Sequence, residues 1–101
     1  MKNRGDAIYL RHILDAISRI ERYIRGVDEE TFHQDVLLQD GVIRQLEIMG
    51  EATKNLSSGL RKRYLHIPWS DIAGMRDKLI HDYLGVDIDA VWATAKEMFC
   101  S

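Results

Sequence analysis

The sequence is poor in cysteine, proline and net charge, and each shortage excludes a class of protein. Cys100 is the one cysteine in 101 residues, so no disulfide can form within the chain, and we expect a reducing compartment, the cytoplasm. One proline and seven glycines leave few interruptions, which favours a few long elements. With 14 basic and 16 acidic residues, the net charge of −2 argues against a protein that coats nucleic acid or membranes through a general basic excess.

Long hydrophobic runs are also missing. No apolar stretch approaches the roughly 20 residues of a membrane span, and the charged N-terminal residues leave no core for a signal peptide. The 46% hydrophobic and 30% charged residues are typical of a globular protein. We therefore expect one domain over residues 1–101, with a modest core.

Apolar residues recur every three or four positions along nearly the whole chain, and no segment alternates with period two for long enough to be a strand. This pattern predicts an all-α fold, an antiparallel bundle of four to five helices. Asp6 is expected to cap the first helix, Gly26 to end it, and Asp87 to cap the last helix. The expected helices cover residues 6–25, about 34–56, 69–84 and 87–99, with short helical stretches at 28–32 and 60–64.

The second long helix has two faces of opposite character. Its apolar spacing predicts a buried stripe of Val42, Leu46, Met49, Thr53 and Leu56. On the opposite face, Arg44 and Glu51 lie two turns apart. They form either an ordinary solvated line of charge or a supporting pair in which Glu51 binds Arg44 or Arg76. Gly50 costs about 1 kcal/mol relative to alanine inside a helix, so we expect another helix to approach closely there.

The charges fall into two blocks. Residues 28–53 hold one basic and seven acidic residues, a net −6, whereas residues 54–81 hold six basic and two acidic residues, a net +4. Solvated helix faces account for most such blocks. A run of basic residues beside an aromatic one also suits an RNA backbone. The candidates for such contacts are Arg61, Lys62 and Arg63, which precede Tyr64, and Lys78.

The third long helix carries the most informative segment. At about 100° per residue, Arg76 and Tyr83 lie on nearly the same line of its apolar face, and His81 points about 140° away from Arg76. Arg76 either pairs with a carboxylate at the edge of the core or binds an anion such as phosphate. Asp77 lies four residues before His81, close enough to pair with its imidazolium. His81 is either an exposed or capping residue or a catalytic one, and Tyr83 is either a packed ring or a functional group.

No other pattern predicts a cofactor. The spacing of His12, His33, His66 and His81 is not that of a zinc site, so we expect no metal. The chain has no glycine-rich phosphate loop. We therefore expect chemistry carried by side chains alone.

Three ordered motifs resemble the HepT family of HEPN-domain proteins. Residues 44–52 follow the pattern R-x-L-E-x-x-G-E-A, residues 67–69 read I-P-W, and Arg76, His81 and Tyr83 follow R-x4-H-x-Y. The similarity runs from the first helix to Trp92. It implies a helical, dimeric, metal-independent ribonuclease, the toxin of a two-gene toxin–antitoxin module. Its partner in the family is a small nucleotidyltransferase antitoxin, which can transfer AMP to the motif tyrosine.

Carried over by position, the resemblance makes Arg76 and His81 catalytic and Tyr83 the AMP acceptor. Asp77, Arg44 and Glu51 would support them. The family usually continues beyond the position of Ser101; if that segment helps to cover the core or the dimer interface, we expect a less stable protein or an altered dimer. The alternative is a non-catalytic helical module that binds a nucleotide or protein and docks a nucleotidyltransferase, or a purely structural bundle.

Cleaving RNA without a metal needs a base, an acid and a cation. One chain offers a single motif histidine, which points away from its arginine on a regular helix. A two-fold dimer would supply two of each. We therefore expect the site at a dimer interface, where Gly50 and Gly74 allow close helix contact.

Overall fold

The computed structural model describes residues 2–81 and 87–97, and the side chains of residues 5–75 and 87–97 within them. The described residues form six helices and no strand, which confirms the all-α prediction. Four or five helices were expected, and the number is higher because two short stretches are separate helices. The helices are α1 (Lys2–Ile24), α2 (Glu29–Gln34), α3 (Val36–Lys54), α4 (Ser58–Arg63), α5 (Trp69–His81) and α6 (Ile88–Glu97).

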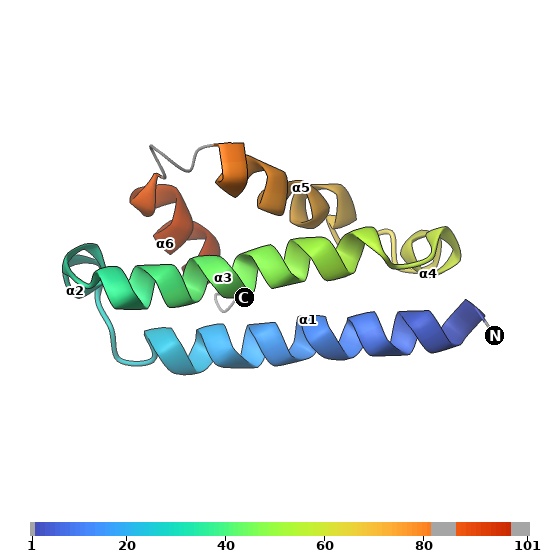
Figure 1. The fold of residues 1–101 in the computed structure, drawn as a ribbon, viewed down its shortest axis with the longest axis horizontal. Coiled ribbons are helices and arrows are strands. Elements are labelled where there is room, and N and C mark those ends of the chain that lie inside the picture. The colour runs from blue at the N-terminus through green and yellow to red at the C-terminus, as the bar shows by residue number, and fades with distance from the viewer. Residues whose placement is uncertain (1, 82–86, 98–101) are drawn as a thin grey trace.

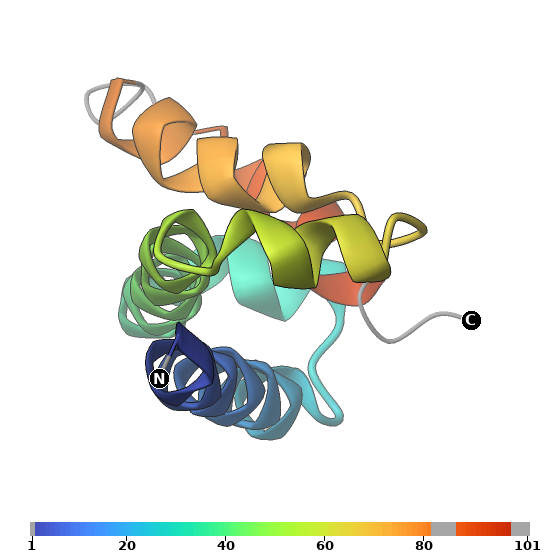
Figure 2. The ribbon, with the colours of Figure 1, turned by 90° about the vertical axis from the view of Figure 1, so that its right-hand side faces the viewer.

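The molecule is elongated, 45 × 28 × 21 Å along its principal axes. Two long helices, α1 and α3, run antiparallel along the long axis, and α3 lies between α1 and α5 (Figures 1 and 2). The two short helices occupy the ends, α2 at one and α4 at the other (Figure 1). Helix α6 packs beside α2 and against α3. None of the described helices combines the length and the apolar character needed to span a membrane.

Helix α1 begins four residues earlier than expected, and Asp6 does not cap it. Asp6 is buried inside α1, and its carboxylate accepts hydrogen bonds from the backbone N–H of Ser57 at 2.8 Å and from the Ser57 hydroxyl at 2.6 Å. The cap prediction is wrong because the actual partner lies 51 residues away. At the other end, Gly26 adopts φ +72° and ends the helix as predicted.

Two aspartates separate α2 from α3. Asp28 caps α2 by accepting a hydrogen bond from the Thr31 N–H at 2.8 Å. Asp35 caps α3 in the same way through the Leu38 N–H at 3.0 Å, so α3 begins at Val36 and not at residue 34.

The buried stripe predicted for the second long helix is confirmed. All five of its residues are buried, and the Thr53 hydroxyl donates to the Met49 carbonyl at 2.8 Å, which satisfies its polar group. Phe32 from α2 is fully buried, and its ring centroid lies 5.0 Å from that of Trp92 in α6. Burial of a large apolar side chain of this kind contributes about 1.5–3 kcal/mol, so this contact holds α2 and α6 together.

A short turn connects α4 to α5. Ser57 caps α4 by accepting from the Leu60 N–H at 3.2 Å. Helix α5 begins directly after Pro68, as predicted, and the Trp69 Nε1–H donates to the Tyr64 carbonyl at 3.0 Å across the turn. The expected end of the third long helix at residues 82–85, and of the last helix at residues 98–99, lies outside the described residues. Asp87 caps α6, as predicted, through the Ala90 N–H at 3.2 Å.

Candidate functional site

The R-x4-H pattern lies on one continuous helix. Helix α5 includes positions 76 and 81, which is the regular geometry from which the opposed directions of Arg76 and His81 were inferred. The side chains of residues 76–81, and all of Tyr83, lie outside the part of the chain that the structure describes. The roles of Arg76, Asp77, Lys78, His81 and Tyr83 therefore stay predictions.

The first half of α5 is anchored on the core. Ile72 and Met75 are half-buried and pack against the buried residues. Beside them, a hollow of about 460 Å³ is lined mainly by apolar groups, together with Asp71, Thr94 and Glu97. Two carboxylates and no basic side chain among these residues make the hollow unsuited to a phosphate. An RNA backbone therefore needs a different surface.

The charged face of α3 lies where the pattern placed it. Arg44 and Glu51 are exposed, on the side away from the buried stripe, and the Asn55 amide donates to the Glu51 carbonyl at 2.9 Å. The pairing of Glu51 with Arg76 or Arg44 stays a prediction.

The two glycines that were expected to permit close helix contact differ. Gly50 is buried in α3, the helix that packs against both α1 and α5. Gly74 is exposed, and a Cβ added there would meet no described atom within 4 Å. Gly74 therefore serves no close approach among the described residues, and its role in a dimer stays a prediction.

One cluster was missed by sequence reasoning. The Nε2 atom of His33 in α2 lies 2.6 Å from a carboxylate oxygen of Asp89 in α6 and 3.7 Å from one of Glu29. An imidazole with two carboxylates is a donor set that transition metals accept. All three groups are exposed, however, and both carboxylates lie in first helical turns, where the helix dipole stabilises them. Their described role is a side-chain contact that links α2 to α6. Only the i, i+4 spacing of Glu29 and His33 was visible in the sequence, because Asp89 lies far away in sequence and comes next to His33 only when the chain folds.

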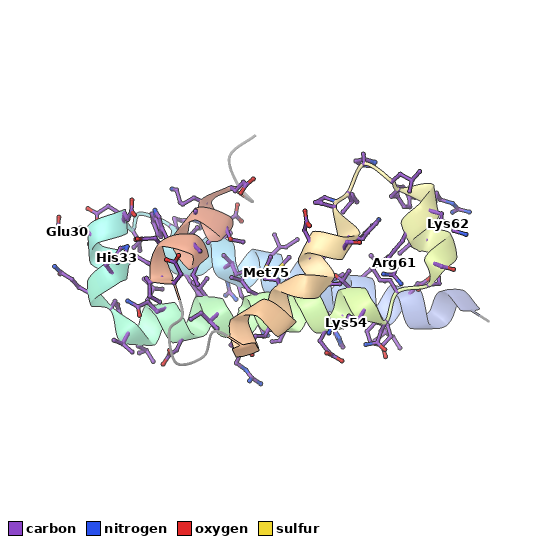
Figure 3. The ribbon with its side chains drawn as sticks, turned by 90° about the horizontal axis from the view of Figure 1, so that it is seen from above. Glu30, His33, Lys54, Arg61, Lys62 and Met75 are labelled. Atoms are coloured by element: carbon purple, nitrogen blue, oxygen red, sulfur yellow. The ribbon has the colours of Figure 1, made fainter. Side chains whose placement is uncertain are left out.

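Three of the candidate RNA contacts gather on α4, and we call Arg61, Lys62 and Arg63 the basic cluster. Lys62 and Arg63 are exposed, and Arg61 is half-buried. Figure 3 shows Arg61 and Lys62 near one end of the molecule, with Lys54 on the same side, and Glu30 and His33 near the other end. The basic cluster and the acidic helix α2 therefore lie toward opposite ends of the long axis (Figures 1 and 3).

Comparison with known proteins identifies the class. Residues 13–99 match the family model of the HepT-like ribonucleases, described as "Ribonuclease HepT-like". The match covers most of the chain, and the chain therefore belongs to the HepT-like family. No solved structure was found to match it.

Curated relatives agree with this assignment. A protein of Thermococcus cleftensis named as a ribonuclease HepT is 47% identical over 94 residues, which cover 93% of this chain and 86% of that protein. A protein of Caldanaerobacter subterraneus subsp. tengcongensis named as an RNase is 44% identical over 86 residues, 85% of this chain and 77% of the relative. Both names mark the activity as inferred.

A third relative is a much longer protein. A Methanocaldococcus jannaschii protein named as a gamma-glutamylcyclotransferase, with an RNase activity that its name also marks as inferred, is 49% identical over 90 residues. The aligned part covers 89% of this chain and 40% of that protein. Ribonuclease activity is thus a property that the names assign at the level of the family.

Proposed function

We propose that this chain is a metal-independent endoribonuclease and the toxin of a toxin–antitoxin module, with Arg76 and His81 as its catalytic residues. The observation that carries the proposal is the family match over residues 13–99, which spans the whole R-x4-H segment on α5. The residue types also suit the chemistry, because a guanidinium binds phosphate oxygens in a bidentate manner and an imidazole transfers protons near neutral pH.

The proposed reaction is an attack within the RNA strand. A base takes the 2′-hydroxyl proton, the 2′-oxygen bonds to the adjacent phosphorus, and the bond from phosphorus to the 5′-oxygen breaks. An acid protonates that leaving oxygen. Arg76 neutralises the added negative charge on the phosphorane, and His81 acts as the base or the acid.

The proposed site is shared by two copies of the chain. Positions 76 and 81 diverge by about 140° on a regular helix, so one α5 does not present both groups to the same phosphate. A two-fold axis beside α5 would bring the arginine of one copy towards the histidine of the other. Gly74 supports this arrangement, because the absence of a side chain there leaves open space on the exposed side of α5.

The proposed control is adenylylation of Tyr83 by a nucleotidyltransferase antitoxin. The tyrosine oxygen bonds to the α-phosphorus of ATP, pyrophosphate leaves, and the phenol proton passes to a base of the antitoxin. The AMP group adds bulk and a negative charge two residues after His81. It would therefore compete with the RNA phosphate for Arg76.

Cleavage assays in EDTA test the proposal. The purified chain is expected to cut RNA in the chelator, and Arg76→Ala or His81→Ala to slow cleavage by about 10²- to 10⁴-fold. His12→Ala, a change of an exposed histidine on α1, is the matched control and should cleave at the normal rate. Full activity in both motif variants would contradict the proposal. AMP on Tyr83 after co-expression with the antitoxin, in a chain that never cuts RNA, would favour the non-catalytic docking module instead.

A further inference from the structure

The surface formed by α4 and the turn after it carries basic and aromatic side chains that have no role in the α5 motif. We propose that residues 58–66 anchor single-stranded RNA, with the basic cluster on its phosphates and Tyr64, with His66 beside it, on an unpaired base. This inference rests on the proposed function, since it assigns that ribonuclease its class of substrate. It concerns residues outside the R-x4-H segment.

The basic cluster can contact several phosphates along a strand. Its three residues are consecutive on a helix, so their side chains leave the axis about 100° apart and spread out. Within the described part of the chain, no carboxylate forms an ion pair with any of them. A fan of cations fits the extended backbone of a polymer better than it fits one compact anion.

The surface is held in place before any ligand binds. Asp6 in α1 fixes Ser57, the cap of α4, with two hydrogen bonds. On the other side, the Trp69 indole N–H binds the Tyr64 carbonyl. A preorganised surface loses less conformational entropy on binding, which increases affinity.

Aromatic rings next to the cations indicate an unpaired strand. The Tyr64 side chain belongs to a residue that is 41% exposed, and its ring centroid lies 6.4 Å from that of the exposed His66, with the ring planes at 73°. A ring at the surface can stack on a base only when that base is free of its own helix. A duplex would offer this surface its phosphates alone.

The position along the chain links this surface to the motif. Helix α5 starts at Trp69, directly after the turn, so a strand held at α4 is next to the helix that carries Arg76 and His81. The opposite end of the 45 Å axis carries the acidic helix α2, which repels RNA.

The salt dependence of binding tests the basic cluster. The probe is a short single-stranded 2′-O-methyl oligoribonucleotide, which lacks the attacking hydroxyl, so binding is measured on the intact protein without cleavage. The slope of log K against log salt is negative, and each lost phosphate contact reduces its magnitude by about 0.7 for a single strand. R61A/K62A/R63A should therefore reduce the magnitude of the slope by about 2. The matched control R19A/R22A/R25A removes three exposed arginines, two in α1 and one directly after it, and should leave the slope unchanged.

Two further variants guard against a folding defect. R61K/R63K keeps the charges and should keep the slope. K62A alone removes one exposed side chain and should reduce the magnitude of the slope by about 0.7. An unchanged slope in K62A and in the folded triple variant would overturn the assignment. Loss of antitoxin binding with normal RNA binding would overturn it too, because the surface would then be a protein-docking site.

Substitution of Tyr64 tests the aromatic part. Tyr64→Leu should weaken single-strand binding by about 5- to 150-fold, which is the range for loss of one base stack, whereas Tyr64→Phe should retain it. Binding of a duplex of the same sequence should be equal in the two variants. Equal single-strand affinities would contradict the stacking role. If RNA binds through α4 but is never cut, the proposed activity fails and the anchoring surface stands.

Discussion

At the scale of single residues, Asp6 shows how one side chain organises a distant part of the chain. Its carboxylate accepts hydrogen bonds from the backbone N–H and the hydroxyl of Ser57, and Ser57 in turn caps α4. The hydroxyl and the backbone N–H of Ser57 hold the pKa of Asp6 below its ordinary value of 3.8, and this effect exceeds the opposing effect of burial. The basic cluster therefore depends on a residue of α1.

This shift predicts a dependence of stability on pH. Because the folded pKa of Asp6 lies below the unfolded one, the ionised carboxylate stabilises the fold fully above the unfolded value of 3.8, and this contribution is lost as the pH falls through the folded value. Asp6→Asn should therefore have a lower melting temperature than the wild type near neutral pH. On acidification below about pH 4, the melting temperature of the variant should fall less than that of the wild type.

Circular dichroism melts between about pH 3 and pH 7 measure this difference. Asp15→Asn, a change of an exposed aspartate on the same helix, should behave like the wild-type chain. A parallel decline in the Asp6→Asn variant and the wild type would contradict the explanation.

At the scale of elements, most helices were predictable because their signals are local. The apolar spacing of α3, the glycine after α1 and the proline before α5 each act within a few residues. The errors have non-local or competing causes. Asp6 caps nothing because Ser57 reaches it across the fold, and the cap at Asp35 makes α3 begin at Val36, two residues after the start that its apolar spacing predicted.

The candidate site was predictable in part for the same reason. The sequence gives the identity and spacing of Arg76 and His81, and α5 confirms that they share a helix. The contact of His33 with Asp89 joins two helices that are far apart in sequence, and no local pattern reports it. The gathering of His66 with Tyr64 likewise depends on the shape of a turn.

Gly5, which lies within α1, and Gly26, which lies in the turn after it, should respond in opposite directions to alanine. Gly26 has φ +72°, so Gly26→Ala should destabilise the chain by about 1–2 kcal/mol. Gly5 lies within the helix, and a Cβ there would meet no described atom within 4 Å. Gly5→Ala should therefore stabilise by about 0.5–1 kcal/mol, because alanine loses less backbone entropy. Urea denaturation measures both, and a change of the same sign in the two variants would refute this account.

At the scale of the whole molecule, a substitution at Gly74 can distinguish an active site shared by two copies of the chain from one contained in a single copy. Gly74→Ala should stabilise α5 by about 1 kcal/mol when the chain is monomeric, because alanine is the better helix former. If two copies meet at Gly74, the same change should weaken the dimer and lower ribonuclease activity. Analytical ultracentrifugation with a cleavage assay on the same samples measures both effects.

Gly5→Ala is the control, since it improves a helix at the far side of α3 from α5 and should leave association unchanged. A Gly74→Ala chain that is more stable, equally associated and fully active would place the catalytic groups away from this face.

The basic cluster and the acidic helix α2 lie toward opposite ends of the 45 Å axis, and together they contribute an electric dipole along it. In the field of a polyanion such a rod experiences a torque, so it turns its α4 end forward before the first contact is made. The orientation of an encounter is thus selected during diffusion, and added salt removes this selection by screening the field over about 10 Å at 0.1 M. A protein that is nearly neutral overall can in this way approach RNA with a preferred direction.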